Sequence, residues 1–111
     1  EIKNNFDAVF SGVGLPLGRS TRTEGSDLEG VYKAIDLLSD FTLRKPVPVE
    51  GKIVIIGGGN VAMDIARTMV RLQREKFGRV DIIVTSLESR DIMPADEEEI
   101  VEAEEEGVKF Y

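Results

Sequence analysis

The sequence predicts an α/β domain built around a parallel β-sheet, mainly because stretches typical of strands alternate with stretches typical of helices. Apolar runs typical of strands occur at 52–56 and 80–86, and apolar residues recur at helical spacing from Asn60 to about Phe77. A second helical stretch and the start of a third strand follow. The connections are too long for β-hairpins, and the order β-α-β-α-β implies parallel strands joined by right-handed crossovers.

Both helices of this pattern have predictable ends. Gly78 is placed to end the first helix, whose apolar stripe consists of Val61, Ala62, Ile65, Ala66, Met69 and Val70. Pro94 stands where the first turn of a helix tolerates proline, and we expect the second helix to run from there to Gly107. Residues 108–111, "VKFY", then begin the third strand.

Residues 1–51 predict shorter elements joined by loops. "FDAVF" at 6–10 is typical of a short strand, and it leads into the glycine loop "SGVG" at 11–14. Residues 15–27 are rich in Gly, Ser, Thr and Pro, which indicates a loop. Two prolines in "RKPVPVEG" at 44–51 exclude a helix and mark a linker. Between these stretches, Asp27 is placed to cap a helix that carries Val31, Ala34, Ile35 and Leu38.

Composition narrows the functional class. At 111 residues the chain is about one domain, and its 41% hydrophobic and 32% charged residues are typical of a soluble globular protein. No apolar run approaches the roughly 20 residues of a membrane helix, so we expect a cytoplasmic protein without a membrane partner. The net charge of −7 argues against nucleic acid as a partner. The absence of cysteine and histidine excludes disulfides and argues against a transition-metal site.

The stretch "IVIIGGGNVAMD" at 53–64 carries the main chemical signal. Gly57, Gly59 and Ala62 occupy the three positions of the pattern G-x-G-x-x-G/A, after a strand and at the start of a helix. The first position permits a tight turn, the second lets a pyrophosphate approach the backbone, and the third lets the helix pack closely. Free N–H groups and the positive end of the helix dipole compensate the phosphate charge. The pattern predicts a dinucleotide site in a Rossmann-type, doubly wound parallel sheet; the alternative is a tight turn without a ligand.

The end of the second strand determines which dinucleotide binds. An acidic side chain there accepts hydrogen bonds from the adenosine ribose and favours NAD, whereas an arginine favours NADP. The strand ends in Thr85 and Ser86, and Glu88 and Arg90 follow. Glu88 favours NAD, while Arg90 with the two hydroxyls could hold a 2′-phosphate, and either charge could equally be an ordinary solvated loop residue. The sequence leaves the choice between NAD and NADP open.

Two motifs, "GGGNVAMDIART" at 57–68 and "MPADEEEIVEAEEEGVKF" at 93–110, resemble the pyridine-nucleotide domain of the glutamate synthase small (beta) subunit and its relatives. These proteins are flavoprotein oxidoreductases with two dinucleotide-binding domains. "FDAVFSGVG", "EGSDLEGVYKAIDLL" and "GKIVIIGGGN" also fit, so the resemblance covers nearly the whole chain. It implies that residues 1–48 form the crossover from an FAD domain plus a connecting helix. Residues 49–111 would then be the N-terminal part of the NAD(P)-binding domain.

The resemblance also implies a route for hydride transfer. NAD(P)H gives a hydride to FAD, and electrons pass on to iron–sulfur clusters and a larger partner subunit. Gly12 and Gly14 match the crossover close to the flavin. Hydride transfer to a flavin is cofactor chemistry, so no catalytic side chain is expected here. By similarity, Asn60 also caps the helix and Asp64 follows one turn on, and the residues against the pyrophosphate are Gly57, Gly58, Gly59, Asn60 and Val61.

Two differences from the family pattern bear on function. Many members carry an arginine pair where Thr85 and Ser86 stand, so a preference for NADP does not transfer, and the connection through "QREKFGRV" is longer than expected. The FAD fingerprint and the cluster-binding cysteines of such proteins lie outside these residues, so we expect a piece of a larger protein. The final electron acceptor stays open. The alternative function is a NAD(P)-sensing regulatory module without redox chemistry, although such a module would not need the "FDAVFSGVG" crossover.

The remaining charges have simpler interpretations. The acidic run at 95–107 is predicted to be a solvated helix face, favourable near a helix N-terminus. Met63 and Met69 are predicted to pack in the core. Four basic residues outside the apolar stripe are predicted to form ion pairs rather than an anion site: Arg67, Arg71, Arg74 and Lys76.

Overall fold

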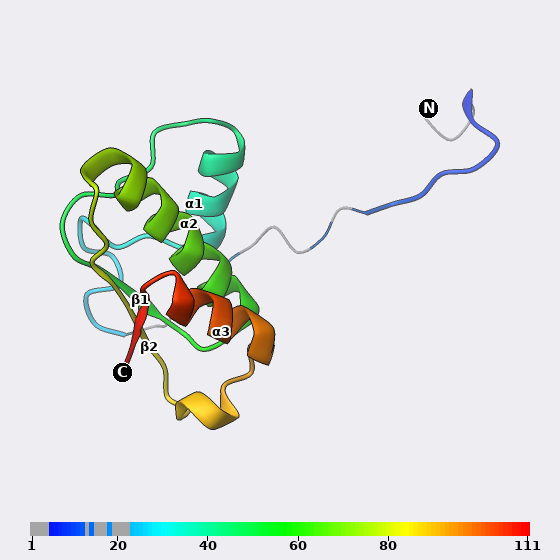
Figure 1. Cartoon of the computed structure of the whole chain (residues 1–111). Helices are drawn as coiled ribbons and strands as arrows, with labels where there is room; N and C mark the ends of the chain where they lie inside the picture. Colours follow the sequence, from blue (N-terminus) through cyan, green and yellow to red (C-terminus); the bar gives the residue numbers. More distant parts are fainter. Residues whose placement is uncertain (1–4, 13, 15–17, 19–22) are drawn as a thin grey trace.

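The computed structural model describes residues 5–12, 14, 18 and 23–111. Its sheet has three parallel strands in the order β1-β2-β3 (Figure 1): β1 (Ile53–Ile56), β2 (Ile82–Thr85) and β3 (Lys109–Phe110). Ile56 lies opposite Thr85, so β1 and β2 end side by side at the carboxyl edge of the sheet. The predicted α/β fold with parallel strands is confirmed, and it is the arrangement of a partial Rossmann-type domain.

The hydrophobic core lies between the sheet and two helices, α2 (Asn60–Phe77) and α3 (Glu97–Glu105), which pack against each other. The strand side chains that face these helices are buried, namely Ile55, Ile82 and Val84. Alternate side chains of β1 face the other way, and there Val54 and Ile56 are 54% and 70% exposed. Successive right-handed crossovers in one direction place their helices on the same face, which explains why one face is covered.

Helix α2 begins and ends where the sequence predicts. Gly78 takes a left-handed conformation, with φ of 66°, and its N–H donates to the carbonyl of Arg74. The predicted stripe is wrong at Val61, which is 43% exposed, whereas Met63 is fully buried. Val61 lies at the border of the buried face, because the helical period directs residues 62, 63, 66 and 70 towards the sheet. Within the described ranges, no helix has both the length and the apolarity needed to cross a membrane.

The connection from β2 to α3 differs from the prediction. A short 3-10 helix, η2 (Arg90–Ile92), which the sequence analysis did not predict, occupies part of it. Helix α3 begins at Glu97 rather than at Pro94, with Asp96 as its N-cap residue. The helix ends at Glu105, and Gly107, with φ of 100°, reverses the chain towards β3.

Two N-terminal predictions are wrong. Residues 6–10 form no strand and are exposed, because no described segment lies beside them to complete a ladder. Asp27 caps no helix: α1 (Ala34–Thr42) begins after Lys33, since residues 24–30 form successive turns. The linker at 44–51 is confirmed as free of helix and strand. Of the loop predicted at 15–27, residues 15–17 and 19–22 lie outside the described residues, as does Val13 of the glycine loop.

The buried side chain of Gln73 binds the backbone just before β1 and just before β2. Its Nε2 donates to the carbonyls of Val49 at 2.9 Å and Gly51 at 2.7 Å, just before β1. Its Oε1 accepts from the N–H of Asp81 at 2.8 Å, just before β2. The amide thereby satisfies three backbone groups at the amino edge of the sheet, opposite the glycine turn.

Candidate functional site

The turn between β1 and α2 consists of three consecutive glycines, each with a different environment. Gly57 has φ of 140°, a backbone conformation that residues with a Cβ rarely adopt. Its N–H donates a hydrogen bond of 2.8 Å to the carbonyl of Thr85, which attaches the turn to the end of β2. This geometry accounts for glycine at the first position of the pattern.

Gly58 is buried beneath the segment that precedes α3. A Cβ here would lie 3.1 Å from Cβ of Ser86 and 3.3 Å from both Cγ of Met93 and Cδ of Pro94. The carbonyl of Gly58 accepts a hydrogen bond of 2.9 Å from the N–H of Ala95. Close packing therefore disfavours any larger residue here, a constraint that the G-x-G-x-x-G/A pattern does not contain.

Gly59 faces open space. A Cβ at this position would meet no heavy atom within 4 Å, and φ of −96° with ψ of 173° is accessible to any residue. Packing among the described residues therefore does not explain the glycine, whereas close approach of a pyrophosphate would. Ala62, at the third position, is buried with its Cβ 3.8 Å from the place of a Cβ on Gly57.

The first turn of α2 presents unoccupied hydrogen-bond donors. The N–H groups of Ala62 and Met63 bond to the carbonyl of Gly59, at 2.9 and 3.3 Å. Among the described residues, no hydrogen bond reaches the N–H of Gly59, Asn60 or Val61, and no side chain caps the helix. The first turn also contains no acidic residue. Free donors at the positive end of an 18-residue helix suit an anion.

Asn60 does not cap α2, contrary to the expectation from the family resemblance. It is the first helical residue, whereas a cap must lie one position earlier in extended backbone, and that position is taken by Gly59. The side chain of Asn60 instead pairs with Asp96. Nδ2 donates to Oδ2 of Asp96, and Oδ1 accepts from the N–H of Asp96, both at 2.8 Å. This pair joins the starts of α2 and α3 at the carboxyl edge of the sheet.

Three of the four residues predicted to contact the ribose lie together at the end of β2. Thr85 and Ser86 are half-buried, and the hydroxyl of Ser86 donates to the carbonyl of Glu88 at 2.5 Å. The Glu88 side chain is exposed, and within the described part of the chain no ion pair or hydrogen bond engages its carboxylate.

Arg90, the fourth, is held by α3. Its Nη1 lies 2.7 Å from Oε2 of Glu97, and its Nε and Nη2 each lie 3.2 Å from one oxygen of Glu104. The hydrogen bonds that the Arg90 guanidinium donates to Glu97 and then to Glu104 raise its pKa, and the contact with Arg90 lowers the pKa of Glu97. Sequence reasoning missed this arrangement. The only sequence signal for the contact with Arg90 is that the two glutamates are seven positions apart, which places them two turns apart on one helix face.

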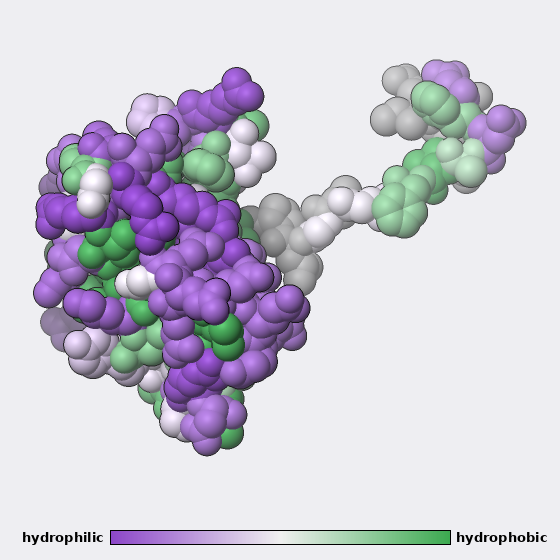
Figure 2. All heavy atoms as spheres, in the orientation of Figure 1, coloured by the Kyte–Doolittle hydropathy of each residue, from purple (hydrophilic) through white to green (hydrophobic). Residues whose placement is uncertain are grey.

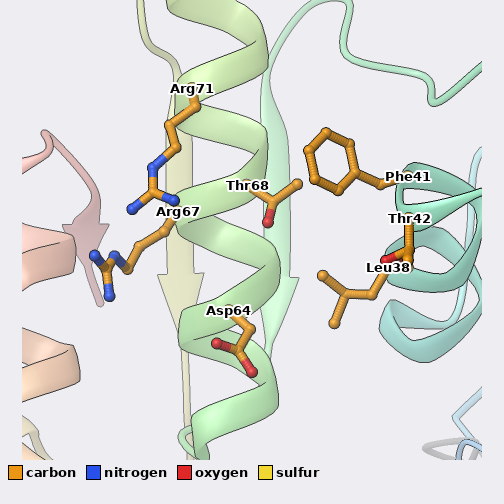
Figure 3. A pocket seen from close by; sticks show the side chains of 7 residues that line it. All are labelled: Leu38, Phe41, Thr42, Asp64, Arg67, Thr68 and Arg71. Atoms are coloured by element: carbon orange, nitrogen blue, oxygen red, sulfur yellow. The ribbon is translucent and has the colours of Figure 1, made fainter. Parts of the chain in front are cut away.

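Asp64 lies one turn into α2, as predicted, but its exposed side chain lines a groove along the helix rather than the glycine turn. Figure 3 shows this groove between α1 and α2. Its volume is about 320 Å³, and it is lined by Leu38, Phe41, Thr42, Asp64, Arg67, Thr68 and Arg71. Of the predicted site residues, Asp64 alone belongs to this groove.

Gly12 and Gly14 are not brought to the glycine turn. The segment 5–12 extends away from the helices and sheet in Figure 1, and both glycines are exposed. A Cβ on Gly12 would meet only the ring of Phe10, and one on Gly14 would meet nothing within 4 Å.

Ion pairs join α2 to α3 on the outer side of the helices. Arg67 contacts Glu99 at 2.7 Å, Glu106 at 3.1 Å, and also Glu102, while Arg71 contacts Glu106 at 2.8 Å. Burial acts to raise the pKa of Glu106, but hydrogen bonds from Arg71 and Arg67 outweigh it and hold that pKa below its usual range. The prediction of ion pairing for these two arginines is confirmed. The glutamates and arginines give this side of the molecule a mainly hydrophilic surface (Figure 2).

The chain is similar over nearly its whole length to several bacterial oxidoreductase subunits. It is 36% identical over 113 residues to the NADPH-Fe(3+) oxidoreductase subunit beta of Geobacter sulfurreducens, covering 99% of this chain and 16% of the relative. It is 34% identical over 114 residues to the NADP(+)-dependent formate dehydrogenase subunit beta of Moorella thermoacetica, covering 100% of this chain and 15% of the relative. It is 34% identical over 121 residues to the glutamate synthase [NADPH] small chain of Escherichia coli, covering 99% of this chain and 25% of the relative. No protein-family model matches the chain.

The chain thus spans a quarter or less of the length of these three relatives. Their names agree with the resemblance indicated by the glycine motif and the acidic helix. The parallel sheet and the glycine turn supply the fold that such a resemblance requires. The chain is therefore homologous to one segment of the glutamate synthase small subunit and of related NADPH-dependent oxidoreductase subunits.

Proposed function

We propose that the chain is the NAD(P)H-binding portion of a flavin-dependent oxidoreductase that resembles the glutamate synthase beta subunit. The start of α2 is the observation that carries this proposal. Gly59 is open to a ligand, and the neighbouring N–H groups of Gly59, Asn60 and Val61 have no partner among the described residues. A pyrophosphate would occupy the space and use these donors.

The other proposed contacts follow from the position of this turn. Thr85, Ser86, Glu88 and Arg90 follow the neighbouring strand and would face the adenosine ribose, and Asp64 would lie one turn beyond the pyrophosphate. Gly12 and Gly14 would approach the flavin where the chain leaves an FAD domain. The relatives are named for NADPH or NADP(+), which makes NADPH the first nucleotide to test.

Other parts of the full-length protein would hold the remaining cofactors. The sequence has no cysteine, and the described residues contain no group of three His, Asp or Glu side chains placed to hold a metal. Iron–sulfur clusters would therefore lie outside this chain. By the family resemblance, most FAD contacts and the larger redox partner would lie outside it as well. The role of this chain's residues is to bind and orient NAD(P)H, which supplies the hydride when bound.

The test is a calorimetric titration of the full-length protein with NADPH, NADH and FAD, followed by anaerobic flavin reduction. We expect NADPH or NADH to bind and to bleach the flavin absorbance. Gly59→Val should abolish nucleotide binding without unfolding the protein, whereas Ser39→Val, at an exposed position of α1, should bind normally. A Gly59→Val variant that binds as well as the parent would refute the site. Nucleotide binding without flavin reduction would favour the sensing module instead.

A further inference from the structure

We propose that Glu97 and Glu104 control the choice between NADPH and NADH by holding Arg90 on α3, away from a 2′-phosphate. This inference rests on the proposed function, because it concerns the ribose end of the same nucleotide site. It adds two residues, neither of which would touch the cofactor. They act as positioning residues through the arginine that they bind.

The geometry shows how completely the arginine is engaged. All three guanidinium nitrogens make contacts: Nη1 with Glu97 at 2.7 Å, and Nε and Nη2 with the two carboxylate oxygens of Glu104 at 3.2 Å each. The Nε–Nη2 edge is the fork that arginine ordinarily offers to a carboxylate or a phosphate. In this structure a carboxylate already occupies that fork.

No other cation in the connecting segment can replace Arg90. It is the only basic residue between β2 and α3, at positions 86–96 of the sequence. The two serine hydroxyls of this segment already have acceptors, since Ser86 donates to the carbonyl of Glu88 and Ser89 donates to the carboxylate of Asp91. A 2′-phosphate would therefore need Arg90, and would have to displace two carboxylates to obtain it.

Displacing the two carboxylates should cost little free energy. The ion pairs would therefore lower the affinity for NADPH rather than prevent NADPH from binding. The side chains of Arg90, Glu97 and Glu104 are 33%, 71% and 42% exposed, and exposed ion pairs contribute little free energy because water screens them. NADH carries no 2′-phosphate and gains nothing from release of the arginine. Releasing Arg90 should thus favour NADPH selectively.

The experiment compares dissociation constants for NADPH and NADH in the full-length protein, by calorimetry. The double variant Glu97→Gln/Glu104→Gln should bind NADPH roughly fivefold more tightly, a change of about 1 kcal/mol, and should bind NADH as the parent does. The control is Glu98→Gln/Glu105→Gln, which removes the same charge from exposed positions of the same helix. It should leave the NADPH to NADH ratio unchanged.

A third variant identifies Arg90 as the group released. Adding Arg90→Gln to Glu97→Gln/Glu104→Gln should abolish the gain for NADPH and leave NADH unaffected. An unchanged ratio in the double variant, an equal change in the control, or a gain that survives Arg90→Gln would each overturn the inference. If the parent protein binds neither nucleotide, the proposed function itself fails, so the two failures are distinguishable.

Discussion

Asn60 and Asp96 bind each other through two hydrogen bonds of 2.8 Å, although 36 residues separate them in the chain. One bond joins the two side chains, and the other runs from the backbone N–H of Asp96 to Oδ1 of Asn60. Asp96 is the N-cap residue of α3, yet its carboxylate makes no cap hydrogen bond. Its side chain therefore stabilises the contact with α2 rather than its own helix.

This relationship predicts strong coupling between the two residues. Asn60→Ala and Asp96→Ala should each lower the free energy of unfolding, but their effects should not add, with a coupling free energy of about 0.5–1 kcal/mol. Urea denaturation of the parent, both single variants and the double variant measures this term. Asp96→Asn keeps both hydrogen bonds and should lie near the parent. Additive effects would show that the bond between the two side chains contributes nothing in solution.

Neighbouring glycines should respond differently to alanine. Gly58→Ala places a Cβ 3.1 Å from Cβ of Ser86 and should lower the free energy of unfolding by about 1–3 kcal/mol. Gly59→Ala meets open space and should change it by less than about 0.5 kcal/mol. Thermal unfolding of both variants compares them directly. Equal losses of stability would mean that the turn adopts another conformation.

Removal of the Gln73 amide should be costly although the site is distant from the glycine turn. Gln73→Leu leaves the carbonyls of Val49 and Gly51 and the N–H of Asp81 without their partner, so we expect a loss of about 2–4 kcal/mol. Glu75→Leu, which introduces the same side chain at an exposed position of α2, is the matched control. Chemical denaturation measures both, and a loss no larger than that of the control would contradict the assignment.

The ion pairs of Glu106 should make stability depend on pH. Its pKa is lower in the folded protein than the ordinary value of 4.5, so its stabilisation is present above that pH and is lost as the pH falls through the folded pKa. Glu106→Gln should therefore lower stability at neutral pH by about 1–2 kcal/mol and converge with the parent under acidic conditions. Glu105→Gln should follow the parent throughout. A constant difference between Glu106→Gln and the parent at all pH values would rule out this linkage.

The sequence predicted the part of the fold in which local signals agree. Helix α2 matches its predicted ends because a glycine turn precedes it, the apolar period continues through it, and Gly78 ends it in a left-handed conformation. The predicted strand at 6–10 failed because a strand needs a neighbour, which a run of apolar residues does not reveal. Asp27 is a competent cap residue, but turns at Gly25 and Gly30 occupy the backbone that a helix would need.

The candidate site likewise has a part that the sequence predicted and a part that it did not. The pattern G-x-G-x-x-G/A predicted the turn at Gly57 and the free helix start, since both are local consequences of the backbone. The partners of Asn60 and Arg90 could not be predicted, because they lie on α3 and depend on how two helices approach each other. The packing requirement at Gly58 likewise arises from Met93 and Pro94, which no local pattern links to it.

The glycine turn is attached to the chain on both sides of the loop that follows β2. Thr85 receives the N–H of Gly57 before the loop, and Ala95 and Asp96 bind Gly58 and Asn60 after it. Residues 87–92 lie between these two attachments, and within them the side chain of Arg90 binds α3 rather than the glycine turn. Their length and sequence can therefore be altered without moving the turn itself, and this loop is the natural place to graft a different cofactor preference by protein engineering.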